Sequence, residues 1–311
     1  MQGNERVFDE LSVLFDIIEK QKISDKDLYG RAKLVLAFAN TMKGDFGASL
    51  EMLTNVASLL GLNELEPDKI DIEKSEDINN YNFIFALNKL LLKDYEDLRQ
   101  DLFEWATFAQ NSGNEFYKNL FKVFLGKILC DSKQARRALE IYDEQISYFA
   151  DKKLAIGALL CWYLIAEATI IASSTHEAID VAQRALDIAQ NPAINNYFFN
   201  VSLKLLLAKA YMKDADYESA NMNLESALAM SQKYGMNDLT SKVYLVYARY
   251  YQELSTADSP NRPDYLKGAK TMYERAMNVV VNQTRSVYMK ETIEENQRQF
   301  EQFCSLNGFN L

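Results

Sequence analysis

Side chains able to perform catalysis or bind metals are few and scattered in this sequence. The chain has one histidine, His176, and three distant cysteines, Cys130, Cys161 and Cys304, which form no C-x-x-C pair. Most zinc sites, and all histidine general bases and Ser–His–Asp triads, need histidine, usually together with other ligands or partners at one site. We therefore expect no catalytic residue, no metal site and no cofactor, and we interpret His176 as a surface residue near a helix start.

Sequence motifs that bind phosphate are absent as well. The chain contains neither G-x-x-x-x-G-K-[ST] nor G-x-G-x-x-G. Carboxylates are plentiful, but pairs such as Glu140 and Glu144 accompany lysine and arginine in helical patterns, where they usually form a solvated face. An enzyme built on a ring of helices is therefore the least supported of the functions that we consider.

The charge balance excludes a further class of function. Lys and Arg number 34 and Asp and Glu 44, which gives a net charge of −10. A dedicated nucleic-acid binder would need a basic surface to neutralise phosphates, so we expect no direct nucleic-acid partner. The odd number of separated cysteines and the lack of a signal-peptide pattern at the N-terminus indicate a reducing, cytoplasmic location.

One apolar segment is long enough to cross a membrane. Residues 154–172 read LAIGALLCWYLIAEATIIA, about the length that a bilayer core requires. Glu167 interrupts this segment, and Trp162 lies near its centre rather than at an interface. We interpret the segment as a central helix of a large helical protein and expect no membrane partner.

The surrounding pattern is helical almost throughout. Apolar residues recur every three or four positions, no run alternates as a strand would, and the chain has only 4 prolines and 11 glycines. Residues 203–220 show a helix, a polar turn and a second helix, with Asp216 placed to cap the second. Short junctions of this kind predict antiparallel helix neighbours.

The helix pairs repeat along the sequence. The second helix of each pair carries a mostly small residue that is followed by an apolar one four positions later. These first members are spaced 49, 40, 40, 42 and 49 residues: Ser49, Leu98, Ala138, Ala178, Ala220 and Ala269. In the first five pairs a small residue stands twelve positions earlier, at Ala37, Ala86, Gly126, Ala166 and Ala208. In the sixth pair the candidate is Ala248, which implies an insertion between its two helices.

This pattern resembles the tetratricopeptide repeat, whose unit keeps small residues at set positions of two helices. The best match is 203–228, and its matching residues are Leu207, Ala208, Tyr211, Tyr217, Ala220, Leu224 and Ala227. The third and fourth units are similar, through Leu125, Gly126, Leu129, Ala138 and Tyr142, and through Trp162, Ile165, Ala166 and Ala178. Departures are Leu98 and Gln145 at normally small positions, and a spacing near 40 rather than about 34.

The resemblance implies an all-α fold, a right-handed superhelical array of about six antiparallel helix pairs. We expect a single array over 1–311, with the six units in 28–281. Insertions are predicted at 63–79, an acidic stretch that would form an exposed loop or a short extra helix, and at 255–264, a loop rich in turn residues. Capping helices are predicted at 4–22 and 284–305, because the end units of an array would otherwise expose an apolar face.

In the family, four positions of each first helix line a concave groove. Mapped onto this chain, these positions supply the expected partner-binding residues Arg31, Phe38, Lys127, Tyr163, Glu167, Lys209, Met212, Lys242 and Arg249. Their cations and apolar side chains would suit an acidic and apolar peptide or helix. The alternative is that the cations are solvated and the aromatic residues belong to the core. A chaperone-tail clamp is not expected, because Leu34 and Phe38, and Val123 and Lys127, occupy its positions.

Two functional hypotheses remain. The first is a scaffold or adaptor that binds a peptide or helix of a partner protein in the groove. The second is the peptide- or ligand-sensing domain of a larger transcriptional or signalling regulator, in which another domain would precede Met1. No helix-turn-helix reading element is evident within the chain itself.

Overall fold

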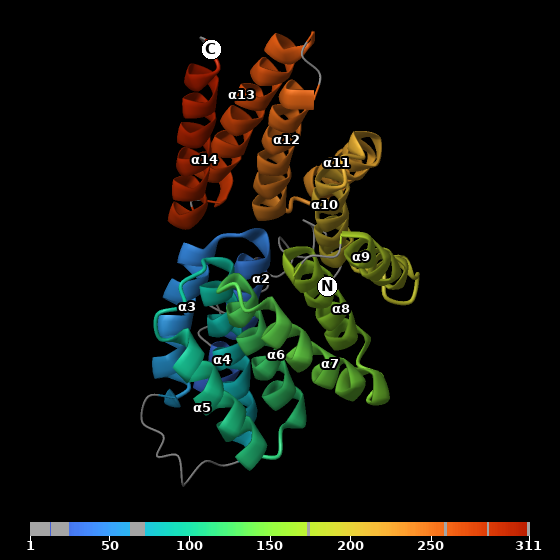
Figure 1. The fold of residues 1–311 in the computed structure, drawn as a ribbon. Coiled ribbons are helices and arrows are strands. Elements are labelled where there is room, and N and C mark those ends of the chain that lie inside the picture. The colour runs from blue at the N-terminus through green and yellow to red at the C-terminus, as the bar shows by residue number, and fades with distance from the viewer. Residues whose placement is uncertain are drawn as a thin grey trace. The chain divides into compact units, whose positions relative to one another are not determined.

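The structure, a computed structural model, describes residues 13, 25–62, 72–172, 175–257, 260–284 and 286–309. Within these ranges the chain is helical and contains no strand, which confirms the all-α prediction (Figure 1). Val13 is the one described residue of the cap predicted at 4–22, and the rest of that helix lies outside the described ranges.

The helices fall into two compact units that meet in sequence between residues 172 and 173. The N-terminal unit contains α2 (Lys26–Lys43), α3 (Phe46–Leu59), α4 (Ile72–Leu91), α5 (Leu98–Asn111), α6 (Glu115–Asp131), α7 (Ala135–Asp151) and α8 (Ala155–Ala172). The C-terminal unit contains α9 (Thr175–Gln190), α10 (Tyr197–Lys213), α11 (Tyr217–Lys233), α12 (Asn237–Ala257), α13 (Arg262–Val279), a π-helical turn (Val280–Thr284) and α14 (Val287–Leu306). The boundary separates the two helices of the fourth predicted pair, so that pairing, the repeat number and the handedness stay predictions.

Each unit is built by packing helices against their neighbours in sequence. In the N-terminal unit α2 packs on α3, α5 on α6, α6 on α7 and α7 on α8. The first helices of successive predicted pairs also touch, α2 with α4, α4 with α6 and α6 with α8. In the C-terminal unit α10 touches α12 in the same way. First helices therefore line up side by side within each unit, as in a helical-repeat array.

Sharp turns join the two helices of four predicted pairs. Gly44, Lys93, Lys133 and Ala215 take positive φ values of 87°, 53°, 63° and 60° between the two helices of a pair. A positive φ turns the chain sharply and ends the helix, although only glycine adopts it without steric cost. The carboxylate of Asp216 accepts a hydrogen bond from the Ser219 backbone N–H at 3.1 Å, which confirms the predicted cap.

The small residues that repeat along the sequence are all buried. Ala37, Ala86, Ala166, Ala208 and Ala248 of the first helices have no exposed surface, nor have Ser49, Ala138, Ala178, Ala220 and Ala269 of the second helices. A Cβ atom added at Gly126 would lie 2.5 Å from Cε1 of Tyr142, so the Tyr142 ring of α7 occupies the space that a side chain at this position of α6 would need. The repeated small residues thus mark the positions where neighbouring helices pack closely together.

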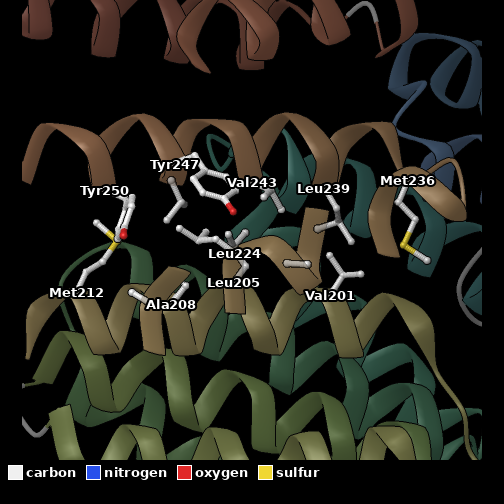
Figure 2. Packing of buried hydrophobic residues seen from close by; sticks show 13 residues of the cluster. Val201, Leu205, Ala208, Met212, Leu224, Met236, Leu239, Val243, Tyr247 and Tyr250 are labelled. Carbon is white, nitrogen blue, oxygen red and sulfur yellow. The ribbon is translucent and has the colours of Figure 1, made fainter. Parts of the chain in front are cut away.

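The core of the C-terminal unit shows how the larger residues fill the remaining space (Figure 2). Its first cluster includes Val201, Leu205, Ala208 and Met212 of α10, Leu224 of α11, and Leu239, Val243, Tyr247 and Tyr250 of α12. A second cluster places Ile293, Phe300 and Cys304 of α14 against Ala269, Tyr273 and Ala276 of α13. Helix α14 therefore buries an apolar face against the last pair and leaves polar residues exposed, as an end helix should.

Parts of both predicted loop insertions are helical, and residues 63–71, 258 and 259 of these insertions lie outside the described residues. Residues 72–79 belong to α4, and Ser75, Asp77 and Asn79 on this turn are buried rather than exposed. Helix α12 continues through Ala257, and α13 starts at Arg262. Ser255 and Thr256 belong to α12, and their hydroxyls donate to the carbonyls of Gln252 and Glu253 in the same helix.

The apolar segment forms α8. It is the one helix of the described residues that is long and apolar enough to cross a membrane, by length and composition alone. It packs against α6 and α7, and its buried residues are Gly157, Leu159, Cys161, Leu164, Ile165, Ala166, Ala168 and Thr169. Less than half of the helix is buried, and Ile156 and Ile171 are exposed, so the interpretation of the segment as a central helix stays a prediction.

Candidate partner-binding surface

All nine residues predicted to meet a partner lie on first helices. Five are in the N-terminal unit: Arg31 and Phe38 on α2, Lys127 on α6, and Tyr163 and Glu167 on α8. Four are in the C-terminal unit: Lys209 and Met212 on α10, and Lys242 and Arg249 on α12. We call the two groups the N-terminal and the C-terminal first-helix surfaces and describe each by itself.

The centre of the N-terminal first-helix surface is an ion-pair cluster. Lys127 Nζ lies 2.7 Å from Asp131 Oδ1, one turn along α6, and 2.8 Å from Glu167 Oε2 on α8. The Tyr95 hydroxyl donates a hydrogen bond to Asp131 Oδ2. The side chains of Lys127, Asp131 and Glu167 keep 20%, 13% and 23% of their surface exposed, so solvent still reaches the cluster.

Electrostatics fix the protonation states in this cluster. Burial alone would lower the pKa of Lys127, but the charges of Glu167 and Asp131 and the hydrogen bond to Asp131 raise it above its usual value. Burial, followed by the charge of Glu167, raises the pKa of the Tyr163 hydroxyl and brings the pKa of the Cys130 thiol to about 12. At neutral pH Lys127 is therefore charged, whereas Tyr163 and Cys130 are neutral.

Aromatic side chains that pack against the core with one side form a second part of this surface. The ring centroid of Phe83 on α4 lies 5.8 Å from that of Phe38, 5.9 Å from that of Phe124 and 6.3 Å from that of Tyr117. Phe38, Phe83 and Tyr117 are half-buried. The Tyr117 hydroxyl donates to Asn80 Oδ1 at 2.5 Å. Half-buried rings with a polar end suit contact with another chain, because they supply apolar area together with a hydrogen-bonding group.

Arg31 is held by a carboxylate on a neighbouring first helix. Its Nε lies 3.0 and 3.1 Å from the two oxygens of Asp77 on α4. The Arg31 side chain is about half exposed, whereas Asp77 is buried. The buried carboxylate therefore has a charged partner, and the arginine ties α2 to α4.

The cations of the C-terminal first-helix surface are also engaged within the chain. Lys242 Nζ lies 2.6 Å from Asp238 Oδ2, one turn earlier on α12, and Arg249 Nη2 donates to Asn296 Oδ1 of α14 at 2.7 Å. Lys209 is exposed. Met212 lies in the core between α10 and α12 and is 7% exposed, so it has little surface for a partner.

The acidic partners of these cations were not foreseen from the sequence. Two of the pairs, Lys127 with Asp131 and Lys242 with Asp238, have the i,i+4 spacing that brings helix side chains together, and this spacing could have found them. Asp77 gives no such signal, because it lies 46 residues from Arg31. The acidic character predicted for the partner stays a prediction, and the internal pairing of the cations weakens its physical basis.

The remaining chemically reactive side chains are the histidine and the cysteines, of which Cys130 neighbours the ion-pair cluster. His176 is exposed, with Nδ1 at 3.9 Å from Asp214 Oδ2, and all three cysteines are buried and free. Among the described residues no group of three or more His, Cys, Asp or Glu side chains could hold a metal ion.

The chain is similar to other proteins in fold, but no similarity in sequence was found. No protein-family model and no curated protein sequence matches the chain. NprR in complex with its cognate peptide NprX is similar in structure over 99% of this chain and 83% of its own, with a TM-score of 0.64 and 15% identity. A Rap protein complexed with Competence and Sporulation Factor is similar over 94% of this chain and 81% of its own, with a TM-score of 0.62 and 13% identity.

A third similar structure contains a tetratricopeptide repeat sensor. It is a signal transduction ATPase with numerous domains from Pyrococcus horikoshii that has a tetratricopeptide repeat sensor. It matches 92% of this chain but 42% of its own length, with a TM-score of 0.56 and 13% identity. The three likenesses confirm the fold: this chain is a helical-repeat protein of the tetratricopeptide-like kind.

Proposed function

We propose that the chain is a protein-interaction module that binds a peptide or a helical segment of a partner along its first helices. The observation that carries the proposal is the similarity, over nearly the whole chain, to NprR with its cognate peptide bound. The Rap complex with Competence and Sporulation Factor supports it in the same way. The proposed role is that of a scaffold or adaptor without catalysis of its own.

The half-buried aromatic residues supply the physical means of binding. Phe38 and Phe83 lie on neighbouring first helices and touch, and both keep part of their rings accessible. Binding energy in protein interfaces is concentrated in a few such anchors, with charged groups adding specificity. The N-terminal first-helix surface offers both kinds of group, which makes it the proposed site of contact.

A second candidate is the sensing domain of a larger regulator. It is favoured by the tetratricopeptide repeat sensor of the Pyrococcus horikoshii protein, in which the region similar to this chain is less than half of the whole. In a sensor, the bound peptide would have to favour one conformation over another. Small-angle X-ray scattering with and without peptide separates the two roles, because a sensor changes its radius of gyration on binding and an adaptor keeps it.

The proposal is tested with peptide ligands that are selected from a random library. Phage-displayed random octapeptides are panned on the immobilised full chain, and an enriched peptide is synthesised and titrated by fluorescence polarisation. We expect Phe38→Ala to weaken binding at least about tenfold, as loss of an aromatic anchor does. The matched control is Phe103→Ala, which truncates an exposed phenylalanine on the second helix α5. The proposal fails if no peptide is enriched, or if Phe103→Ala weakens binding as much as Phe38→Ala.

A further inference from the structure

The ion-pair cluster of the N-terminal unit has unequal numbers of positive and negative groups. Lys127 contributes one positive charge, and Asp131 and Glu167 contribute two negative ones. Lys127 is the one cation that these carboxylates contact among the described residues, and the neighbouring Tyr163 and Cys130 are neutral at neutral pH. The cluster therefore keeps a residual charge of about −1 in a partly dehydrated place.

The hydrogen bonds of the cluster are unevenly distributed between the two carboxylates. Asp131 uses Oδ1 for Lys127 and Oδ2 for the Tyr95 hydroxyl. Glu167 uses Oε2 for Lys127, and within the described residues its Oε1 accepts no hydrogen bond. Since the Glu167 side chain is 23% exposed, this oxygen is the acceptor that remains available to an incoming donor.

A second polar group near these carboxylates, on α7, also lacks a hydrogen-bond partner in the described residues. The Tyr142 side chain reaches from α7 across Gly126 of α6 and is fully buried. Its hydroxyl has no hydrogen-bond partner in the described part of the chain, although it lies within range of the charges of Glu167 and Asp131. Buried polar groups are nearly always paired, so the Tyr142 hydroxyl and the open oxygen of Glu167 leave hydrogen-bonding capacity unused beside the two carboxylates.

The neighbouring Tyr163 and the aromatic residues elsewhere on the N-terminal first-helix surface complete the arrangement. We propose that Glu167 receives a cationic group of the bound peptide, an ammonium or a guanidinium, while the half-buried rings of Tyr163 and, further along the surface, Phe83 contact apolar residues of the same peptide. The residual negative charge favours a cation and opposes the acidic partner that the sequence predicted. This inference rests on the proposed peptide-binding function and adds the charge of the ligand.

The proposal predicts opposite effects on peptide affinity for substitutions of Glu167 and of Lys127. Removing the negative charge by Glu167→Gln takes away the acceptor, so the peptide should bind more weakly. Removing the competing cation by Lys127→Gln leaves two carboxylates facing the ligand, so a cationic peptide should bind more tightly. An acidic ligand held by Lys127 would respond in the opposite sense to both substitutions.

The experiment uses a synthetic peptide from the octapeptide selection and the full chain. Its lysine and arginine residues are replaced one at a time, lysine by norleucine and arginine by citrulline, and a separate version is N-acetylated. We expect one of these changes to weaken binding to the unmodified chain by about tenfold, and Glu167→Gln to abolish that difference. Loss on acetylation identifies the cation as the N-terminal amine, and loss on side-chain replacement identifies it as lysine or arginine.

Controls separate binding from folding. Glu144→Gln removes the same charge from an exposed position on the second helix α7 and should leave the discrimination intact. Thermal unfolding followed by circular dichroism shows that each variant is folded at the temperature of the titration. Lys127→Gln keeps the test decisive if Glu167→Gln does not fold.

Three results are possible. A tenfold discrimination that disappears in Glu167→Gln, or a tighter complex in Lys127→Gln, supports the inference. A peptide that binds without needing any cation, or that binds Lys127→Gln more weakly, overturns the inference and leaves the peptide-binding proposal standing. If the selection yields no peptide at all, the proposed function fails and the inference fails with it.

Discussion

Lys127 on α6 and Glu167 on α8 form an ion pair of 2.8 Å between residues that are 40 positions apart. The small residues of the third and fourth pairs, Ala138 and Ala178, have the same separation. The two charged residues thus occupy equivalent positions of consecutive repeats, and they meet because the first helices lie side by side. The repeat period itself is enough to bring them together.

The first prediction concerns the stability of this pair. Lys127→Met leaves two carboxylates without their cation, and Glu167→Gln leaves Lys127 with Asp131 alone. Because the pair is partly buried, we expect each substitution to lower the free energy of unfolding by about 1–3 kcal/mol. The double variant should lose less than the sum of the two, with a coupling of about 0.5 kcal/mol or more. Urea denaturation of the four proteins measures the cycle, and strict additivity would show that the contact contributes nothing.

A second prediction follows from the close approach of α6 and α7. Gly126→Ala would place a Cβ atom 2.5 Å from the ring of Tyr142, so the ring must move and stability should fall by about 1–3 kcal/mol. Gly47→Ala is the matched control. There the nearest atom to the added Cβ, Asp45 Oδ1, is 3.9 Å away, and the helix should gain up to about 1 kcal/mol. Equal effects of the two substitutions in urea denaturation would contradict the packing described for α6 and α7.

A third prediction concerns a polar contact that ties three helices. Asn88 Nδ2 on α4 lies 2.9 Å from Thr41 Oγ1 on α2 and 3.0 Å from Ser49 Oγ on α3, and all three side chains are buried. Asn88→Ala removes the shared donor and leaves a void, so the unfolding free energy should drop by about 1–3 kcal/mol. Asn55→Ala, which truncates an exposed asparagine on α3, should change it by less than about 0.5 kcal/mol. A loss in Asn55→Ala as large as in Asn88→Ala would contradict this account.

A fourth prediction concerns alkaline pH. Burial raises the pKa of Cys130 and of Cys161 from 9.0 to about 12, so each thiol ionises more readily in the unfolded chain than in the folded one. The stability that this difference provides is complete below pH 9 and is lost as the pH rises toward 12. Each thiol should contribute a slope of up to about 1.4 kcal/mol per pH unit in that window.

The slope is measured by urea denaturation between about pH 8 and pH 11. The double variant Cys130→Ala with Cys161→Ala should show a shallower decline than the unmodified chain. An identical decline would mean that the thiols are as easily ionised in the folded state as in the unfolded one.

The fold could be predicted from the sequence because, in helical repeats, the residues at helix contacts recur at a nearly constant spacing. Ala208 and Ala220 are small where two helices touch, and the period that they share with the other pairs marks the same contact each time. Asp216 was recognisable as a cap because helix starts need a side-chain acceptor at one defined place. Both signals are local, so a single sequence suffices to read them.

The surface was predictable only in part. The periodic positions located Lys127 and Glu167, but the sequence did not show that they pair with each other rather than with a ligand. Met212 satisfied the same positional rule, yet it lies in the core, since a position on a helix does not reveal how closely the next helix packs. Asp77 lies in a segment whose acidic composition resembles that of a loop, and its partner Arg31 comes from another helix 46 residues away.

The central claim, that a peptide binds along the first helices, is tested most directly by footprinting. Carbene labelling of the full chain with and without the selected octapeptide reports which side chains the peptide covers. We predict that the bound peptide lowers the labelling of α4, α6 and α8, at Phe83, Tyr163 and Glu167. Labelling of the exposed Phe103 on α5 should stay unchanged. Protection of Phe103 and its helix with no change at Phe83 and Tyr163 would contradict the claim.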